Sequence, residues 1–438
     1  MLKNSLHPFS FLAFASLRLR GFALKEAGVA APIIVALATL LITPCMYAQE
    51  PAAREPVKLT DEGKKVHAST FVFDGHNDLP WELRTKAGSS FDKRDIAQPQ
   101  KEMHTDIPRL RVGNVGAQFW SVYVPADTAK KGTALQQTLE QIALVQEMLR
   151  RYPAVFEQAR TAADVERIQK SGKIASLIGV EGGHSIEDSI ENLRRLHKLG
   201  AGYMTLTHSD TLAWADSATD TGKHQGLSPF GEEIVREMNK LGMLVDLSHV
   251  SDETMRDALA ISKAPIIYSH SSARAIAKHP RNVPDDILLL VKQNGGVVMV
   301  NFYPGFVVPK SAEIMAKMFD ARRELRARFP KEEDYERELK RWEAANPYPS
   351  GSIHDVVDHI EHIAKVAGVE SVGIGSDFDG IPKVPKQLED VSTYPLITQE
   401  LLNRGWKADD IGKLMSGNIL RVMRGAEQVA KELAAARK

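Results

Sequence analysis

The chain has 438 residues, 43% of them hydrophobic, which is enough for one large α/β barrel or for two to three smaller domains. Lysine plus arginine equals aspartate plus glutamate at 56 each, so no net charge favours nucleic acid or an acidic membrane surface as the partner, and a small molecule is expected instead. The single cysteine, Cys45, lies in an N-terminal apolar segment, so a domain that begins near residue 60 has neither a disulfide nor a thiolate ligand. Any metal ion in that domain must therefore be held by His, Asp and Glu.

The N-terminal segment is typical of an export signal. Basic residues precede an uncharged run over 27–43, and cleavage could occur near Ala48. We therefore expect residues 1–48 to be an export signal or an N-terminal anchor, and the protein to be exported to the periplasm or the cell envelope. Any membrane contact would be through this anchor alone. Residues 49–66 are polar and contain prolines, so they are expected to form a linker.

Eight short apolar runs, rich in β-favouring residues, are predicted to be strands. They lie at 71–73, 117–124, 174–180, 203–207, 243–247, 265–269, 297–300 and 371–375. Apolar residues at three- and four-residue spacing predict helices between most of them. These helices lie at about 133–151, 186–200, 229–240, 251–261 and 285–293, and two more, at 397–404 and 408–433, close the chain. This alternation predicts a single (β/α)8 barrel of the TIM type over residues 67–438.

The charged segment over 304–352 interrupts the alternation just before the last strand. We expect a helical insertion above the barrel mouth, with its charges on a solvated helical face. A role as a lid over the mouth is conceivable from the sequence.

Nearly every predicted strand ends in a side chain that could bind a metal or transfer a proton. These residues are His76, Asp78, Glu181, His208, His249, His270 and Asp377. Because the carboxyl ends of barrel strands converge on one mouth, residues far apart in the sequence are expected to meet there. Ordinary polar surface residues would have no reason to occur at nearly every strand end.

Three features favour a metal site among these residues. His76 and Asp78 are two apart, so on an extended strand both side chains point the same way, although an isolated His-x-Asp also fits an ordinary polar turn. His249 and His270 are 21 apart, about one βα unit, which places them on neighbouring strands where a metal could bridge them. Glu181 would be costly to bury unpaired, and a cation would relieve that cost.

A second group of possible ligands occurs at His354, Asp358 and His362, which share one helical face. The same helix has an apolar face for the barrel, so we expect this group to point outward into solvent. The sequence contains no Gly-x-Ser-x-Gly elbow and no phosphate-cradling loop, which disfavours serine nucleophiles and nucleotide chemistry.

These residues give the chain a close resemblance to the membrane (renal) dipeptidase family of zinc peptidases, and to its bacterial members in particular. The resemblance covers about residues 67–425. It is carried by Asp74-Gly75-His76-Asn77-Asp78-Leu79-Pro80, Gly179-Val180-Glu181-Gly182-Gly183-His184, Thr205-Leu206-Thr207-His208, Asp246-Leu247-Ser248-His249-Val250-Ser251, Ser269-His270-Ser271-Ser272-Ala273, Arg281-Asn282-Val283-Pro284-Asp285-Asp286 and Gly375-Ser376-Asp377-Phe378-Asp379-Gly380.

The resemblance implies a metallopeptidase that hydrolyses dipeptides at two zinc ions, often tolerating a D-residue at the C-terminal side. His76 and Asp78 would hold one ion and His249 and His270 the other, while Glu181 would bridge both. Asp377 would transfer protons, His208 would support the developing oxyanion, and Arg281 would bind the substrate carboxylate. A homodimer is compatible with the sequence.

The chain departs from the family pattern in two places. Phe306 stands where mammalian members have a substrate-contacting tyrosine, and the 304–352 insertion is longer than theirs. Two alternatives stay open at this point. One is another barrel amidohydrolase, such as a lactonase or deaminase, although these usually carry His-x-His on the first strand. The other is an envelope binding protein that retains zinc without catalysis.

Overall fold

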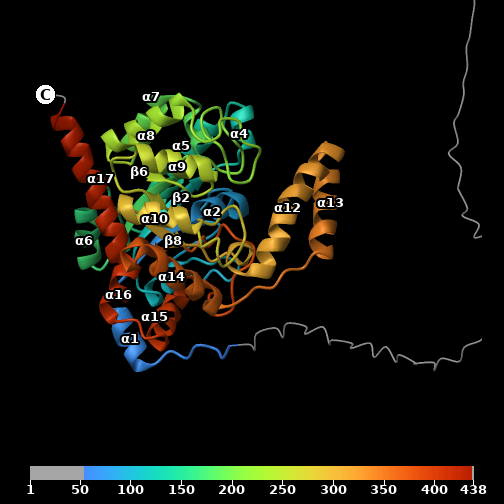
Figure 1. Cartoon of the computed structure of the whole chain (residues 1–438). Helices are drawn as coiled ribbons and strands as arrows, with labels where there is room; N and C mark the ends of the chain where they lie inside the picture. Colours follow the sequence, from blue (N-terminus) through green and yellow to red (C-terminus); the bar gives the residue numbers. More distant parts are fainter. Residues whose placement is uncertain (1–53, 437–438) are drawn as a thin grey trace, which may run out of the picture. The chain divides into compact units, whose positions relative to one another are not determined.

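Eight parallel strands form a closed ring in this computed structural model, which describes residues 54–436 (Figure 1). The ring strands are β1 (Val72–Asn77), β2 (Val115–Tyr123), β4 (Ile174–Glu181), β5 (Ala201–Thr205), β6 (Leu244–Asp246), β7 (Ile267–Tyr268), β8 (Val297–Val300) and β9 (Val372–Ile374). Pairing of β2 with β4 closes the ring. The predicted (β/α)8 barrel is therefore confirmed.

Aromatic side chains fill the barrel interior. The ring centroids of Phe73 and Phe119 lie 5.5 Å apart, and those of Phe119 and Tyr203 lie 4.8 Å apart. Because β2 and β5 are not neighbours in the sheet, the second contact crosses the barrel. Gly179 makes room for Tyr203, since a Cβ there would lie 2.0 Å from the tyrosine ring. The interior packing thus carries the Tyr203 hydroxyl toward the mouth.

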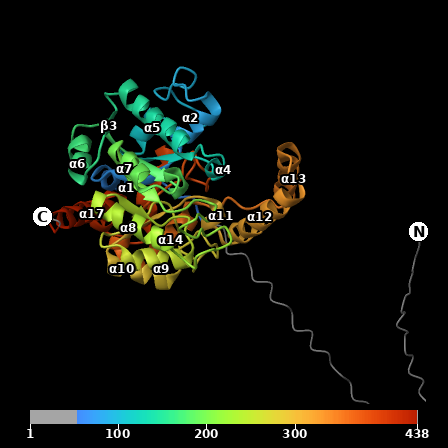
Figure 2. The same ribbon diagram turned by 90° about the horizontal axis from the view of Figure 1, so that it is seen from above.

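Helices cover the outside of the ring (Figures 1 and 2). They are α2 (Leu79–Ala87), α5 (Ala134–Arg151), α6 (Ala162–Lys170), α7 (Ile190–Lys198), α8 (Pro229–Leu241), α9 (Asp252–Ile261), α10 (Asp285–Asn294), α14 (Ile353–Ala367), α15 (Tyr394–Asn403) and α17 (Asn418–Ala435), with the short helices α3 (Ile107–Val112), α4 (Asp127–Lys130) and α16 (Ala408–Gly412). Ser251 caps α9 by accepting a hydrogen bond from the Thr254 amide at 3.2 Å. Within residues 54–436, no helix is both long and apolar enough to cross a membrane.

Two elements differ from the expectations. A short strand, β3 (Phe156–Gln158), pairs with the beginning of β4 and was not predicted. The expected linker over 49–66 is wrong in its last part, because α1 (Asp61–Ala68) begins there and packs against α15. His67 anchors it, with Nδ1 2.8 Å from the Thr398 hydroxyl. The expected export signal over 1–48 lies outside the described residues.

The polar face of α14 is not solvated, which corrects the expectation for His354, Asp358 and His362. His354 Nδ1 lies 2.8 Å from Glu400 Oε1 on α15, and His362 Nε2 lies 2.7 Å from Asp285 Oδ1. Asp358 accepts a hydrogen bond from Arg404 Nη1 at 2.7 Å. Each histidine is thus used in packing, and these three residues form no candidate metal site in the part of the chain that is described.

Arg404 joins three carboxylates at this helix interface, since it also binds Glu361 and Glu400 at 2.8 and 2.7 Å. Burial would raise the pKa of Asp358 and of Glu400, but hydrogen bonds from arginine outweigh burial and lower both pKa values. We expect Arg404→Gln to reduce the free energy of unfolding by about 1–3 kcal/mol at pH 7, because it leaves partly buried carboxylates unpaired.

Calorimetry or denaturant unfolding measures this loss, with the exposed Arg424→Gln on α17 as the matched control. Carboxylates with a lowered folded pKa contribute stability above their unfolded pKa and lose it as the pH falls through the folded value. The difference between wild type and Arg404→Gln should therefore be complete at pH 7 and shrink below about pH 4. A difference that grows in acid would contradict the assignment.

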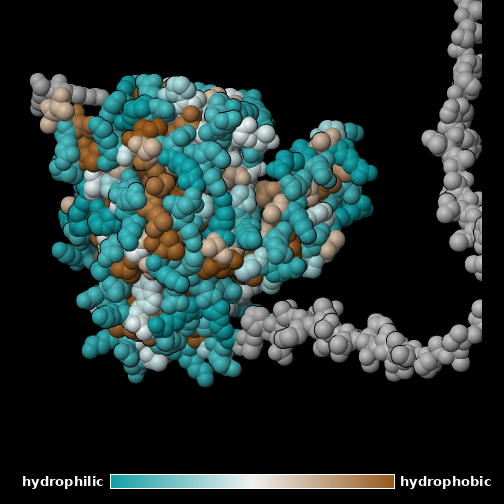
Figure 3. Space-filling model, viewed as in Figure 1, coloured by the Kyte–Doolittle hydropathy of each residue, from teal (hydrophilic) through white to brown (hydrophobic). Residues whose placement is uncertain are grey.

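The segment after β8 forms a helical hairpin. It contains α11 (Pro304–Val307), α12 (Pro309–Arg328) and α13 (Glu332–Ala345), and α12 and α13 lie side by side and project from the barrel (Figures 1 and 2). Its surface is mostly hydrophilic in the view of Figure 3. Arg323 on α12 donates a hydrogen bond to the Thr219 carbonyl at 3.1 Å, so the hairpin reaches the loop that follows β5.

Candidate metal centre and substrate pocket

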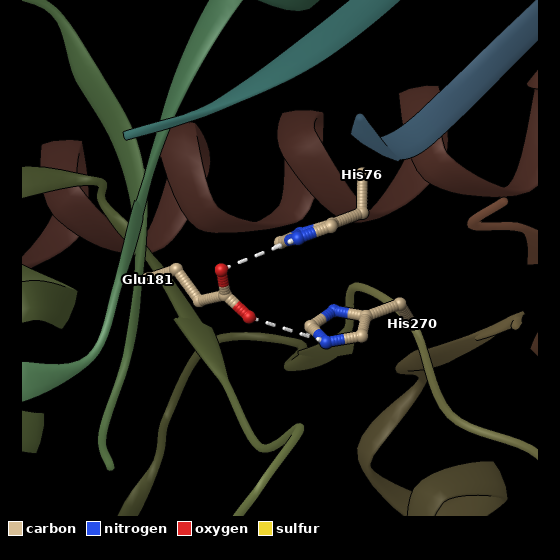
Figure 4. Close-up of side chains that lie close together, drawn as sticks. All are labelled: His76, Glu181 and His270. Carbon is tan, nitrogen blue, oxygen red and sulfur yellow. Dashed lines mark ion pairs between the residues drawn. The ribbon is translucent and has the colours of Figure 1, made fainter. Parts of the chain in front are cut away.

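The structure brings all seven strand-end residues together at the barrel mouth. Glu181, the last residue of β4, lies at the centre (Figure 4). One of its oxygens, Oε2, lies 3.5 Å from His76 Nε2, and the other, Oε1, lies 3.1 and 3.4 Å from Nε2 of His249 and His270. Oε2 therefore faces the His76 nitrogen, whereas Oε1 faces the nitrogens of His249 and His270.

On the first side, His76 lies near the end of β1 and Asp78 directly follows the strand. His76 Nε2 lies 3.1 Å from Asp78 Oδ2. Both His76 Nε2 and Asp78 Oδ1 are buried without a hydrogen-bond partner. A buried polar atom without a partner costs free energy, and a cation bound between these atoms would satisfy both of them.

On the second side, His249 and His270 follow β6 and β7, and their Nε2 atoms lie 2.9 Å apart. Burial is the largest cause that lowers the pKa of each histidine well below its ordinary value, so both imidazoles are neutral. A neutral imidazole offers a lone pair to a metal. His249 has a φ of +70°, a strained conformation for a residue with a side chain, which directs it into the site.

Neighbouring residues fix the orientation of these histidines. The Ser269 hydroxyl donates to Asp246 Oδ2 at 2.6 Å and lies 2.8 Å from His270 Nδ1. Because that hydroxyl has already donated its proton, it accepts one from Nδ1, and His270 Nε2 is left free as a ligand. His76 Nδ1 similarly lies 2.8 Å from the Tyr203 hydroxyl.

The donor set fits bound metal ions. Three groups of side chains have ligand atoms that lie within 4.8 Å of one another: His76, Glu181 and His270; Glu181, His208 and His249; and His76, Asp78 and Asp377. Imidazole nitrogens and carboxylate oxygens are the ligands that zinc takes when no thiolate is present. Because Glu181 belongs to two groups, the centre has room for more than one ion.

Asp377 follows β9 and lies at the edge of this centre. Its φ is +65°, and Asn301 donates a hydrogen bond to its Oδ2 at 2.9 Å. Burial raises its pKa to about 8, and the charges of Asp78 and Glu181 add to the effect while His76 opposes it. A cation held by the neighbouring ligands would lower this pKa. With the ion bound, the carboxylate form of Asp377 is favoured, and a carboxylate at this position can accept a proton and release it again.

His208 lies above Glu181, with its Nε2 3.6 Å from Glu181 Oε1. Its ring centroid is 4.2 Å from that of His249 and 4.8 Å from that of Tyr123. Burial lowers the pKa of His208 to about 4, so the imidazole is neutral at pH 7 and can donate a hydrogen bond from one nitrogen.

Arg281 is 2% exposed and lies behind the histidines. Its Nη1 lies 3.3 Å from the Ser271 hydroxyl, its Nη2 donates to the His270 carbonyl at 3.2 Å, and its guanidinium lies 5.2 Å from the centre of the Phe306 ring. Burial lowers its pKa to about 10, which leaves it charged at neutral pH. Its Nε is buried without a partner, and the side chain lines the pocket, so its positive charge is available to an anionic ligand.

Most of these groups line one pocket of about 430 Å³ that opens to solvent. Its floor is the metal centre, and its walls include Tyr303 and Phe306 beyond β8 and Met318, Phe319 and Arg322 on α12. The pocket is large enough for a small peptide, and the hairpin forms part of its wall.

Sequence reasoning missed the residues that orient the ligands. Tyr203 lies mid-barrel, where its sequence neighbours predict only a strand residue. Asn301 directly follows β8, just as the predicted ligands lie at the ends of their strands. This position could have indicated that Asn301 lies at the mouth, where it donates a hydrogen bond to Asp377. Ser121, whose hydroxyl donates to Glu181 Oε2 at 3.1 Å, carried no signal of its own.

A (β/α)8 barrel with a cluster of His, Asp and Glu ligands at its mouth and an arginine beside it defines a metal-dependent hydrolase. The profile of the family described as membrane dipeptidase (peptidase family M19) matches residues 60–437. The chain belongs to this family of metallopeptidases, which confirms the predicted membership and sets aside the lactonase and deaminase alternatives.

Solved structures share the fold. The probable dipeptidase PvdM from Pseudomonas aeruginosa is 24% identical, with 84% of this chain and 98% of that chain covered and a TM-score of 0.73. A metallopeptidase from Rhodobacter sphaeroides, whose structure contains a phosphinate mimic of the dipeptide L-Ala-D-Ala, is 23% identical, with 82% and 99% covered and a TM-score of 0.66.

Proposed function

We propose that this metallodipeptidase uses two zinc ions, with Glu181 bridging them, and accepts dipeptides that carry a D-residue at the C-terminal position. The carboxylate of Glu181, with one oxygen near His76 and the other near His249 and His270, is the observation that carries the proposal. A pair of zinc ions, when bound, supplies an activated water nucleophile at neutral pH and polarises the scissile carbonyl.

The chain's own residues perform the remaining work. Arg281, which lines the pocket, binds the free carboxylate of the dipeptide through its guanidinium, which fixes where the substrate ends. His208, held neutral by burial, donates a hydrogen bond to the oxygen of the scissile carbonyl as negative charge develops. Asp377 accepts a proton from the attacking water at its carboxylate and passes it to the leaving amine.

Tolerance of a D-residue is supported by the ligand of the Rhodobacter sphaeroides structure, which mimics L-Ala-D-Ala. In this chain Phe306 offers an apolar ring beside Arg281 and no hydroxyl. Phe306 can therefore pack against the C-terminal side chain but cannot donate a hydrogen bond to its carboxylate, and this proposal leaves that carboxylate to Arg281.

The test uses the full-length protein. We expect close to two zinc ions per chain and hydrolysis of L-Ala-L-Ala and L-Ala-D-Ala, with no cleavage of the corresponding tripeptide. Removal of metal by a chelator should abolish turnover, and Zn²⁺ should restore it. One bound ion at full activity would contradict the bridging role. Chelator-resistant turnover would remove the metal from the reaction.

We further propose that the protein is exported and acts in the periplasm or envelope, either free or through an N-terminal anchor. The basic and apolar pattern before residue 48 supports this proposal. Fractionation of cells that express the full chain tests the location, and the molecular mass of the protein in each fraction shows whether the N-terminal segment has been cleaved. Activity found only in the cytoplasm would contradict it.

A further inference from the structure

Among the described residues that line the substrate pocket, Arg322 is a charged residue without a place in the metal centre or the proposed reaction. It lies on α12, and its face of the helix also carries Met315, Met318 and Phe319 at three- and four-residue spacing. Met315 is buried against Tyr303 and Gly305, in the segment that follows β8, and Met318 lines the pocket, so this face of α12 is turned toward the mouth. Arg322 thus enters the pocket from the hairpin and not from a strand end.

The guanidinium of Arg322 is only weakly paired. Its Nη2 lies 3.9 Å from Glu343 Oε1 on α13, and the two side chains are 41% and 47% exposed. Such a long, solvated ion pair contributes little. Arg322 Nε, in contrast, is buried and has no hydrogen-bond partner among the described residues. A guanidinium that lines a pocket and is held only by one long ion pair is available to bind an anion.

The position of Arg322 assigns it to one end of the substrate. Phe319, one turn earlier on α12, has its ring 5.6 Å from that of His279, which in turn lies 4.7 Å from Phe306. Phe306 covers Arg281. The face of α12 that carries Phe319 and Arg322 therefore packs beside the wall that holds Arg281, and both arginines line the same pocket. We place the C-terminal residue of the dipeptide between them.

The charged groups that line the pocket also indicate different roles for Arg281 and Arg322. The lining carboxylates, Asp78, Glu181 and Asp377, all belong to the metal centre. If Arg281 binds the main-chain carboxylate, Arg322 is free for a second negative group one side chain away. A dipeptide with two carboxylates at its C-terminal residue has this arrangement.

We infer that Arg322 selects dipeptides whose C-terminal residue is acidic, by binding the side-chain carboxylate of that residue. This inference rests on the proposed dipeptidase function. The hairpin is then an element that determines specificity. Its helix α12 forms one side of the mouth and brings a positive charge there that no strand end supplies.

The experiment compares kcat/KM of the zinc-loaded full-length enzyme for Ala-Glu, its neutral isostere Ala-Gln and the reversed Glu-Ala. Wild type should prefer Ala-Glu, and Arg322→Gln should lower kcat/KM for Ala-Glu by about 10-fold or more while leaving Ala-Gln unchanged. Arg322→Glu should reverse the preference and favour Ala-Lys. Arg328→Gln, an exposed arginine later on α12, is the matched control and should change nothing.

Each other outcome overturns the inference in a distinct way. An equal loss on Ala-Glu and Ala-Gln in Arg322→Gln would assign Arg322 to the main-chain carboxylate. A loss confined to Glu-Ala would place it at the N-terminal residue. Ala-Gln turnover without any preference for Ala-Glu would leave the dipeptidase function standing and remove the specificity role. Absence of turnover on every dipeptide would overturn the proposed function and this inference together.

Discussion

Asp377→Asn is expected to lower kcat for dipeptide hydrolysis by about 10²- to 10⁴-fold with little change in bound zinc. The reason is that an amide cannot take a proton from the attacking water, whereas the Asp377 carboxylate can accept one and release it again. KM should change less than kcat, because Asp377 is assigned to proton transfer and not to holding the substrate.

Asparagine is the right replacement because it preserves the backbone and the neighbours. Asp377 has a φ of +65°, a conformation that asparagine tolerates better than most residues. The side-chain carbonyl of asparagine can still accept the hydrogen bond from Asn301. The exposed Asp92→Asn serves as the matched control, and single-turnover kinetics with metal analysis are the measurements.

The same experiment separates two roles for Asp377. Its ligand atom lies within 4.8 Å of those of His76 and Asp78, so it could also bind a metal directly. Loss of one zinc ion in Asp377→Asn would assign it as a ligand. Full metal content with unchanged kcat would remove it from the reaction.

Most of the barrel could be predicted because its strands are buried on both faces and therefore form continuous apolar runs. Even β7, with two residues, was located by the run that ends in His270. The strand β3 escaped because its three residues, Phe156–Gln158, pair only with the beginning of β4 and have no pattern of their own. The helix α1 escaped because its stability comes from contacts with α15, far along the chain.

The metal centre was predictable for a topological reason. A closed barrel carries each strand end to one mouth, so residues as distant as His76 and His270 meet without any local signal that joins them. The orienting residues follow no such rule. Tyr203 reaches His76 across the barrel interior, and which interior side chain reaches the mouth depends on packing around Gly179.

Charge patterns were the weakest guide. The helix α14 has a polar face that predicted solvent exposure, yet Arg404 and Glu400 of α15 pair with it. The charged sequence of the hairpin α12–α13 also predicted solvent exposure. Most of its charges are indeed exposed, but Arg322 lines the pocket. Amphipathic periodicity identifies the buried face of a helix and leaves open what its polar face meets.

Glu181→Gln is expected to have the largest effect of any single substitution: loss of at least one zinc ion and a fall in kcat/KM of more than about 10³-fold. Burial by itself would raise the pKa of Glu181, but the charge of His76 and the contact with His249 hold it well below its usual value, so the side chain is an anion. Glutamine keeps its shape and removes that charge from between the histidines.

The expected loss follows from the geometry on both sides of Glu181. With an amide in place of the carboxylate, one of the two positions facing His76 and the His249–His270 pair becomes an N–H donor, which cannot bind a cation. Zinc analysis by mass spectrometry and dipeptide turnover measure the outcome, with the exposed Glu191→Gln on α7 as control. A Glu181→Gln enzyme that retains two zinc ions and full activity would show that the two halves of the centre are held independently, because the His76 and His249–His270 sides would then bind their ions without a shared anion.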